Sequence, residues 1–132
     1  MQAIEQILQS SKNIAVVGLS DKPDRPSFGV ASFLLAHGYQ IFPVNPNISE
    51  WCGIKAYQSL GEIKEKIDIV DIFRKSEDVL PIVQDAIHIN AKTVWMQLGV
   101  VNDAAAEIAQ GAGLNVIMDK CLKIEHIRVF GK

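Results

Sequence analysis

The sequence predicts one α/β domain of three layers, in which helices cover both faces of a doubly wound parallel sheet of about five strands. Short aliphatic runs of strand length alternate with segments whose apolar residues recur at helical spacing. The chain has 132 residues, which suffices for one hydrophobic core and not for two. We therefore expect a single domain over residues 1–132.

The expected elements follow one another along the chain. Residues 2–10 are predicted as a short amphipathic helix. The predicted strands are dense apolar runs at 14–17, 40–44, 67–73, 93–96 and 115–118. Helical spacing recurs over 30–34 before Gly38, over 79–87 after Ser76-Glu77-Asp78, from a cap at Asn102 or Asp103 to Gly111, and over 122–129. Residues 48–66 are less regular, and we interpret 54–57 as a short edge strand and 60–66 as a short helix.

Helices between successive strands require parallel pairing, so these elements form a Rossmann-like domain. In such sheets a ligand binds outside the carboxyl ends of the strands, where the strand order reverses. The candidate segments are therefore those that directly follow the predicted strands: 18–29, 45–47, 73–76, 97–100 and 119–121.

The loop after the first strand has the composition of a phosphate site. Gly18 leaves room for a ligand to approach the backbone, and Ser20 and Ser27 offer hydroxyl groups. Lys22 and Arg25 add positive charge before a predicted helix, whose N-terminus favours anions. The loop matches neither the G-x-G-x-x-G pattern nor the Walker pattern.

The end of the second strand discriminates between nucleotides. Folds that bind NAD place an acidic residue there to accept hydrogen bonds from the ribose. Here the strand ends at the neutral Asn45, followed by Pro46, and no carboxylate occurs before Glu50. A neutral end tolerates a phosphate on the ribose, which favours coenzyme A or NADP over NAD and leaves these two open.

Composition excludes several other classes. The net charge of −2 leaves no basic surplus for binding nucleic acid. No apolar run approaches the roughly 18 residues of a membrane span, and no export signal is visible, so we expect a cytoplasmic protein. Cys52 and Cys121 lie far apart and form no zinc motif, and we expect no disulfide and no metal site.

Five segments at the predicted strand ends carry a family resemblance. They are Ala15–Ser20, Pro43–Pro46, Asp68–Arg74, Val94–Val100, and Asp119–Cys121 together with Glu125-His126. In this order they resemble the small stand-alone CoA-binding proteins, whose domain is similar to the CoA-binding domain of the succinyl-CoA synthetase α subunit. The resemblance covers about 14–126 and implies coenzyme A or an acyl-CoA as the ligand.

The resemblance also implies roles for single residues. Gly18 and Ser20 would line the pyrophosphate, Asn45 and Pro46 the adenosine, Phe73 and Arg74 the crevice, and Gln97 and Gly99 the pantetheine path. The ligase relatives carry a phosphohistidine on a second domain, and no histidine here matches that loop. The resemblance therefore favours a non-catalytic binding module, with a homodimer or a partner subunit as a possible arrangement.

The sequence leaves a second function open, a small NADP- or CoA-dependent enzyme or a thiol-redox protein that uses Cys121. Lys120, Lys123 and His126 would supply the positive field that a reactive thiolate needs. The other interpretation makes Cys121 a small buried residue between strand and helix.

Three more side chains have an expected location. Trp95 is predicted in the core, because it lies within a strand. Trp51 follows an Asn-rich turn and is expected to be partly exposed. Asp71 lies inside a buried strand and is expected in the interior.

Overall fold

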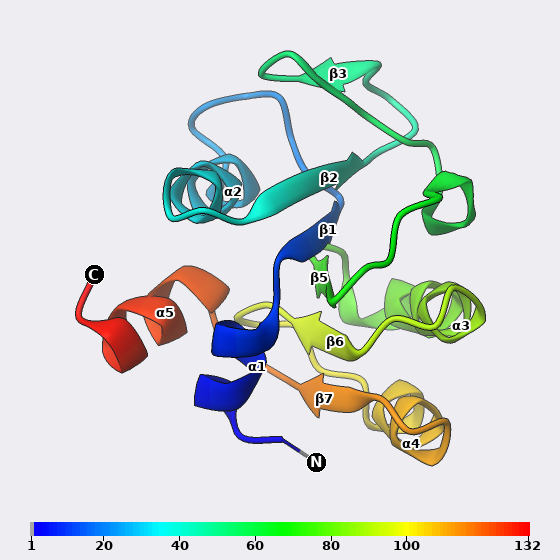
Figure 1. Ribbon diagram of the computed structural model, residues 1–132. Helices are drawn as coiled ribbons and strands as arrows, with labels where there is room; N and C mark the ends of the chain where they lie inside the picture. The colour runs from blue at the N-terminus through cyan, green and yellow to red at the C-terminus, as the bar shows by residue number, and fades with distance from the viewer. Residues whose placement is uncertain (1) are drawn as a thin grey trace.

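The computed structural model describes residues 2–132 and contains the predicted three-layer α/β domain (Figure 1). Its central sheet is parallel and has the strand order β2-β1-β5-β6-β7. The strands are β1 (Asn13–Val17), β2 (Gln40–Val44), β5 (Ile69–Ile72), β6 (Thr93–Met96) and β7 (Asn115–Ile117). The continuous apolar runs therefore form the strands, because both faces of the sheet are covered.

Helices cover the two faces of this sheet, as Figure 1 shows. One face carries α1 (Ile4–Ser10), α2 (Pro26–Ala36) and α5 (Leu122–Phe130), and the other carries α3 (Val79–His88) and α4 (Asp103–Gly111). Successive side chains of a strand point to opposite faces. Ile14 and Val16 of β1 accordingly join the core beneath α2, whereas Ala15 and Val17 join the core beneath α3.

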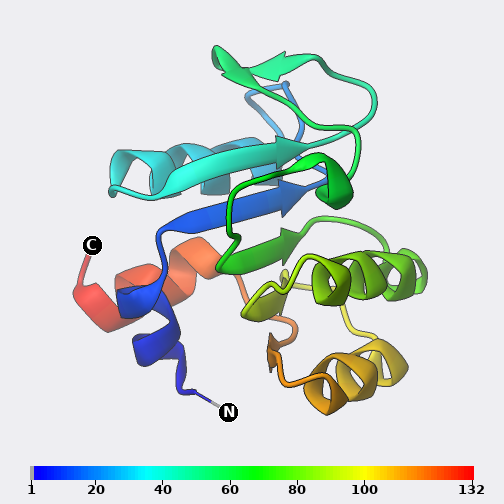
Figure 2. The same ribbon diagram turned by 45° about the vertical axis from the view of Figure 1, so that its right-hand side comes forward.

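The strand order reverses between β1 and β5. The chain leaves β1 through α2 to reach β2 on one side, and later returns from β2 to β5 on the other side. The five strands of this sheet are parallel, and Figure 2 shows β2, β1 and β5 pointing the same way, so the loops that follow the strands gather at one edge. Folds with this strand order bind ligands at the reversal point, which here lies at the ends of β1 and β5.

Two helix starts show how the predicted caps are used. The Asn102 side chain caps α4, since its Oδ1 accepts a hydrogen bond from the Ala105 N–H at 2.9 Å. Ser76 and Asp78 do not cap α3 through their side chains; residues Ser76–Asp78 form a 3₁₀ turn before it. The Ser76 hydroxyl instead accepts from the Val101 N–H at 3.0 Å and so joins two loops.

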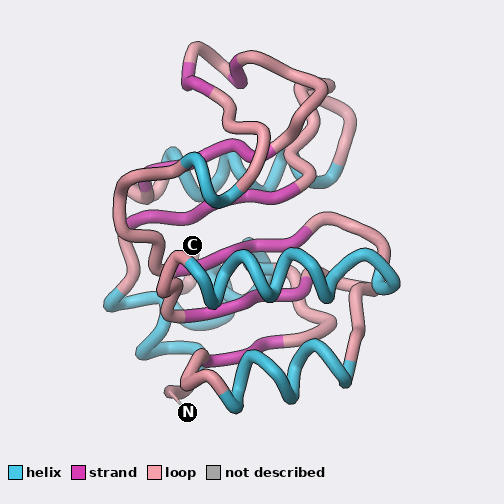
Figure 3. Tube along the Cα trace, turned by 90° about the vertical axis from the view of Figure 1, so that its right-hand side faces the viewer, coloured by secondary structure: helices cyan, strands magenta, loops and turns pink. Residues whose placement is uncertain are grey.

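Residues 48–66 differ from the prediction. The expected edge strand is confined to β4 (Ile54–Lys55), which pairs antiparallel with β3 (Glu50–Trp51) in a separate hairpin beyond β2 (Figure 3). The expected helix over 60–66 is one 3₁₀ turn at Leu60–Glu62. The expectation that Trp51 is partly exposed is wrong, because the hairpin folds over α2 and places the indole, 1% exposed, at 5.3 Å from the Phe28 ring.

The third predicted strand is shorter than the apolar run that indicated it. The run begins at Ile67, but β5 begins at Ile69. Asp68 lies at the entry, where its carboxylate accepts from the Lys12 and Asn13 N–H groups at 2.9 and 3.0 Å. Ile67 is buried without being in the strand. Over residues 2–132, no helix is long and apolar enough to cross a membrane.

Candidate functional site

Three adjoining cavities lie at the carboxyl edge of the sheet. One of about 320 Å³ surrounds the loop after β1, one of about 500 Å³ lies beside the end of β2, and one of about 600 Å³ lies between α2 and α5. Gly18 lines the first two, Phe73 the first and third, and Arg74 the second and third. The three cavities therefore adjoin one another at these residues, and together we call them the carboxyl-edge crevice.

Gly18 begins the loop between β1 and α2 with a conformation that excludes other residues. Its φ is +86°, and a β-carbon at this position would collide with the main-chain oxygen of Phe73. The Gly18 N–H donates to the Val44 carbonyl at 2.9 Å. Gly18 thus lets the chain leave β1 within contact distance of the end of β5, and its missing side chain keeps the middle of the crevice open.

The predicted hydroxyl and cationic residues of this loop all line the first cavity. The Ser20 N–H donates to the buried Ser27 hydroxyl at 3.0 Å, and the Lys22 N–H donates to the Ser20 hydroxyl at 3.1 Å. Both hydroxyl oxygens therefore shape the loop, while a hydroxyl that accepts can still donate its own proton. Lys22 and Arg25 are exposed, and Arg25 directly precedes α2. The cavity thus combines two cations with a helix N-terminus, an arrangement that favours anions.

Asn45 and Pro46 both line the second cavity, and the Asn45 amide also makes hydrogen bonds that hold the loops in place. Its Nδ2 donates to the Leu19 carbonyl at 3.0 Å, and its Oδ1 accepts from the Asn47 N–H at 2.9 Å. The first bond holds the loop after β2 against the loop after β1, and the second shapes the turn within the loop after β2. A neutral amide is required for this, because a carboxylate has no N–H to give to Leu19.

The wall opposite Asn45 was not predicted from the sequence. It consists of residues from the irregular segment after β4 and from α3: Gln58, Ser59, Leu60, Ile82 and Asp85. Asp85 brings a carboxylate into this cavity from a helix, where no strand-end pattern indicates it. Ile82 and Asp85 are three residues apart, which places both on one side of α3. Only that helical spacing, read together with the strand order, could have pointed to them.

The third cavity is mostly apolar. The candidate residues Gln97, Phe73 and Arg74 line it, together with residues from α2, from α5 and from the loop after β6. Gln97 is 4% exposed, and its Oε1 accepts from the Leu122 N–H at 3.0 Å, which fixes the start of α5 to β6. Gly99 lines none of the three cavities; its N–H donates to the Asp119 carboxylate at 2.7 Å and so shapes the loop after β6.

Cys121 and His126 are not brought together. Cys121 directly precedes α5 and lines the third cavity at the carboxyl edge. The His126 ring contacts Phe33 and Phe130, and its Nδ1 lies 2.9 Å from the Lys132 carbonyl. Tyr39, which also contacts this ring, lies just before β2 and thus at the opposite edge of the sheet.

Asp71 lies beneath the crevice in the middle of β5. It is in register with Val16 and Trp95, and it is fully buried, as is Trp95. Among residues 2–132, neither of its carboxyl oxygens has a hydrogen-bond partner. Burial therefore raises the pKa of the Asp71 carboxyl well above its ordinary value of 3.8. The buried surroundings thus favour the uncharged form of this side chain.

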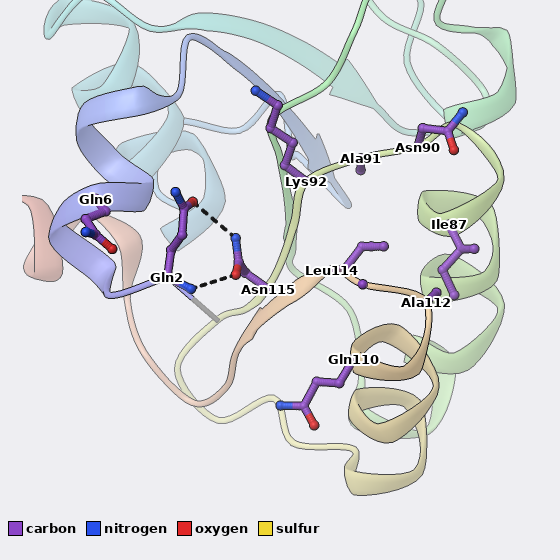
Figure 4. Close-up of a pocket in the computed structure, with 11 residues that line it drawn as sticks. Gln2, Gln6, Ile87, Asn90, Ala91, Lys92, Gln110, Ala112, Leu114 and Asn115 are labelled. Atoms are coloured by element: carbon purple, nitrogen blue, oxygen red, sulfur yellow. Dashed lines mark hydrogen bonds between the residues drawn. The ribbon is translucent and has the colours of Figure 1, made fainter.

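Another cavity, of about 900 Å³, opens at the opposite edge of the sheet (Figure 4). Its lining is rich in amides, and Asn115 exchanges hydrogen bonds of 2.9 and 3.4 Å with Gln2. It contains none of the predicted site residues. Within the described part of the chain, no cluster of three His, Cys, Asp or Glu side chains could hold a metal ion.

Comparisons with known proteins bear on this geometry. A family model for the CoA binding domain matches residues 12–127. An uncharacterised protein of Bacillus subtilis, YneT, is 47% identical over 93% of this chain and 91% of that protein. The structure of a hypothetical protein from Pyrococcus horikoshii has a TM-score of 0.94 at 41% identity, covering 97% of this chain and 90% of that chain. The ADP-forming acetate–CoA ligase II of Archaeoglobus fulgidus is 33% identical over an aligned segment that covers 46% of this chain and 9% of the ligase.

Proposed function

Because the chain belongs to the family of CoA-binding domains, we propose that it binds coenzyme A or an acyl-CoA in the carboxyl-edge crevice, as a non-catalytic binding module. The observation that carries this proposal is the order of the three cavities. The pocket beside Asn45 adjoins, at Gly18, the cavity that carries two cations, and this cavity adjoins the apolar cavity at Pro26 and Phe73. Coenzyme A has the same order of adenosine, diphosphate and pantetheine.

The diphosphate belongs in the cavity around the loop after β1. Gly18 gives the ligand access to the backbone, and α2 directs its N-terminus toward the same space. Lys22 and Arg25 supply positive charge from the rim. Because both side chains are exposed, their contribution is mainly long-range attraction that salt screens.

The adenosine belongs in the cavity between Pro46 and α3. Asn45 presents no negative charge to a phosphate on the ribose, and its amide keeps the pocket wall in place. The Asp85 carboxylate, across this pocket, can accept hydrogen bonds from the amine of an adenine or from a ribose hydroxyl.

The second candidate function is thiol-dependent chemistry at Cys121. The observation in its favour is that Cys121 lines the apolar cavity, in which the thiol end of the pantetheine arm would lie. It lacks a general base, because His126 is directed to the other edge of the sheet. We therefore rank it below the binding module. A cytoplasmic location and a dimer or partner-subunit arrangement are further parts of the proposal.

The proposal is tested in two steps. First, the protein is purified without added ligand, and any co-purifying molecule is identified by mass spectrometry. Second, calorimetric titration compares coenzyme A, dephospho-coenzyme A and NAD. We expect coenzyme A to bind at least tenfold more tightly than NAD, a difference of about 1.4 kcal/mol. Equal or tighter binding of NAD would contradict the proposal, and dephospho-coenzyme A reports whether the 3′-phosphate is recognised.

A further inference from the structure

The cavity between α2 and α5 has an unusually apolar wall. Gln97, Cys121 and the two cations Arg74 and Lys75 are its polar or sulfur-containing members, and the rest are Pro26, Val30, Phe73, Leu98, Val100 and Ile124. Leu98 is 65% exposed and Ile124 is 55% exposed, although both are large aliphatic residues. Exposed aliphatic side chains that border a cavity, rather than scattered singly over a surface, indicate a binding site for apolar groups.

This cavity continues directly from the proposed diphosphate site. Pro26 and Phe73 line both spaces, so a ligand that extends from the first cavity into the third would meet Leu98 and Ile124, which line the third. No Asp or Glu is among its lining residues. Arg74 lies at the boundary with the second cavity and is 3.6 Å from the Asp78 carboxylate, so its charge is already compensated.

We propose that the space bordered by Leu98 and Ile124 binds the uncharged aliphatic acyl chain of an acyl-CoA that is longer than acetyl. This inference rests on the proposed function and adds the class of the acyl group. Its physical basis is the hydrophobic effect: each methylene of the chain that leaves water and covers Leu98, Ile124 or Val100 favours binding. A chain that ends in a carboxylate would lose part of this gain, because its charge must keep its water.

The experiment is a series of calorimetric titrations with coenzyme A, acetyl-CoA, hexanoyl-CoA and adipoyl-CoA. The last two have the same number of acyl carbons and differ by a terminal carboxylate. We expect hexanoyl-CoA to bind at least tenfold more tightly than acetyl-CoA, and more tightly than adipoyl-CoA. The variants Leu98→Ser and Ile124→Ser should each lower the preference for hexanoyl-CoA over acetyl-CoA at least threefold.

Ile108→Ser is the matched control. Ile108 is 43% exposed, but it lies on α4, which covers the opposite face of the sheet. This variant should keep the full preference for hexanoyl-CoA. If coenzyme A binds and the acyl chain makes no difference, the inference is overturned while the proposed function stands. Tighter binding of adipoyl-CoA would also overturn it. If neither coenzyme A nor any acyl-CoA binds, the proposed function itself fails.

Discussion

Gly18 and Phe73 lie so close that a β-carbon on Gly18 would collide with the main-chain oxygen of Phe73. The two residues directly follow β1 and β5, the strands between which the sheet reverses its order. This contact brings the two loops together at the middle of the carboxyl-edge crevice. It also makes Gly18 a residue for which both the fold and the proposed ligand set the same requirement.

The first prediction concerns Gly18→Ala. The new methyl group must push the two loops apart, and φ at +86° is strained for alanine. We expect the free energy of unfolding to fall by about 1–3 kcal/mol and the affinity for coenzyme A to fall at least tenfold. Denaturant unfolding and calorimetry measure the two effects. Gly29→Ala is the control, because its β-carbon would meet nothing within 4 Å in the first turn of α2. Full affinity in a folded Gly18→Ala protein would place the ligand elsewhere.

A second prediction tests whether Lys22 and Arg25 act on the ligand as solvent-exposed charges or as side chains buried against it. Lys22→Ala and Arg25→Ala should each weaken coenzyme A binding by roughly twofold to fivefold at low salt, because both side chains are exposed. The effect should shrink as salt is added. Lys66→Ala provides the comparison, since Lys66 is an exposed cation beside Asn13 at the opposite edge. A loss that persists in high salt would show that these cations are desolvated in the complex.

The parts of the site that were predictable are those that one strand end determines. Continuous apolar runs marked β1, β2 and β5, and the residue after each run therefore had to lie at the carboxyl edge. That logic indicated Gly18 and Asn45, whereas Phe73 was predicted as the last residue of its run; the structure places all three along the crevice. It did not reveal the role of Asn45, since the hydrogen bond to the Leu19 carbonyl joins two loops whose spacing depends on the whole sheet.

The parts that were missed depend on contacts distant in sequence. Trp51 follows a polar turn, and its burial depends on the hairpin folding against Phe28 of α2. Asp85 reaches the second cavity because α3 packs on the face of the sheet to which β5 contributes Val70 and Ile72. No residue near Asp85 in sequence indicates a ligand. Gly99 follows a strand end like the others, yet it lines none of the three cavities, and its N–H donates to the Asp119 carboxylate.

The third prediction concerns the buried carboxyl of Asp71. Its pKa in the folded protein is raised well above 3.8 by burial, whereas the unfolded chain titrates near 3.8. The unfolded state therefore releases a proton first, and the contribution of Asp71 to stability is lost as the pH rises from about 3.8 through the raised pKa.

Asp71→Asn removes this titration with little change in shape. The free energy of unfolding of the wild type, measured by denaturant titration at several pH values, should fall relative to Asp71→Asn as the pH rises above 3.8. Parallel pH profiles for the two proteins would show that Asp71 ionises in the folded state much as it does in the unfolded chain.

The last prediction is that Cys121 is not a catalytic nucleophile. Hydrolysis of a thioester needs a thiolate or an activated water, with a base within hydrogen-bond distance. Cys121 lines the apolar cavity before α5, in which a thioester would lie under the proposed binding mode. The base is missing, because His126 lies one and a half turns along α5 by the helical repeat of about 3.6 residues, and its Nδ1 faces the Lys132 carbonyl. We therefore expect acetyl-CoA to be hydrolysed at the same background rate by the wild type and by Cys121→Ser at matched concentrations, measured by thiol release. A wild-type rate well above background that disappears in Cys121→Ser would make Cys121 the nucleophile and replace the binding module by a thioesterase.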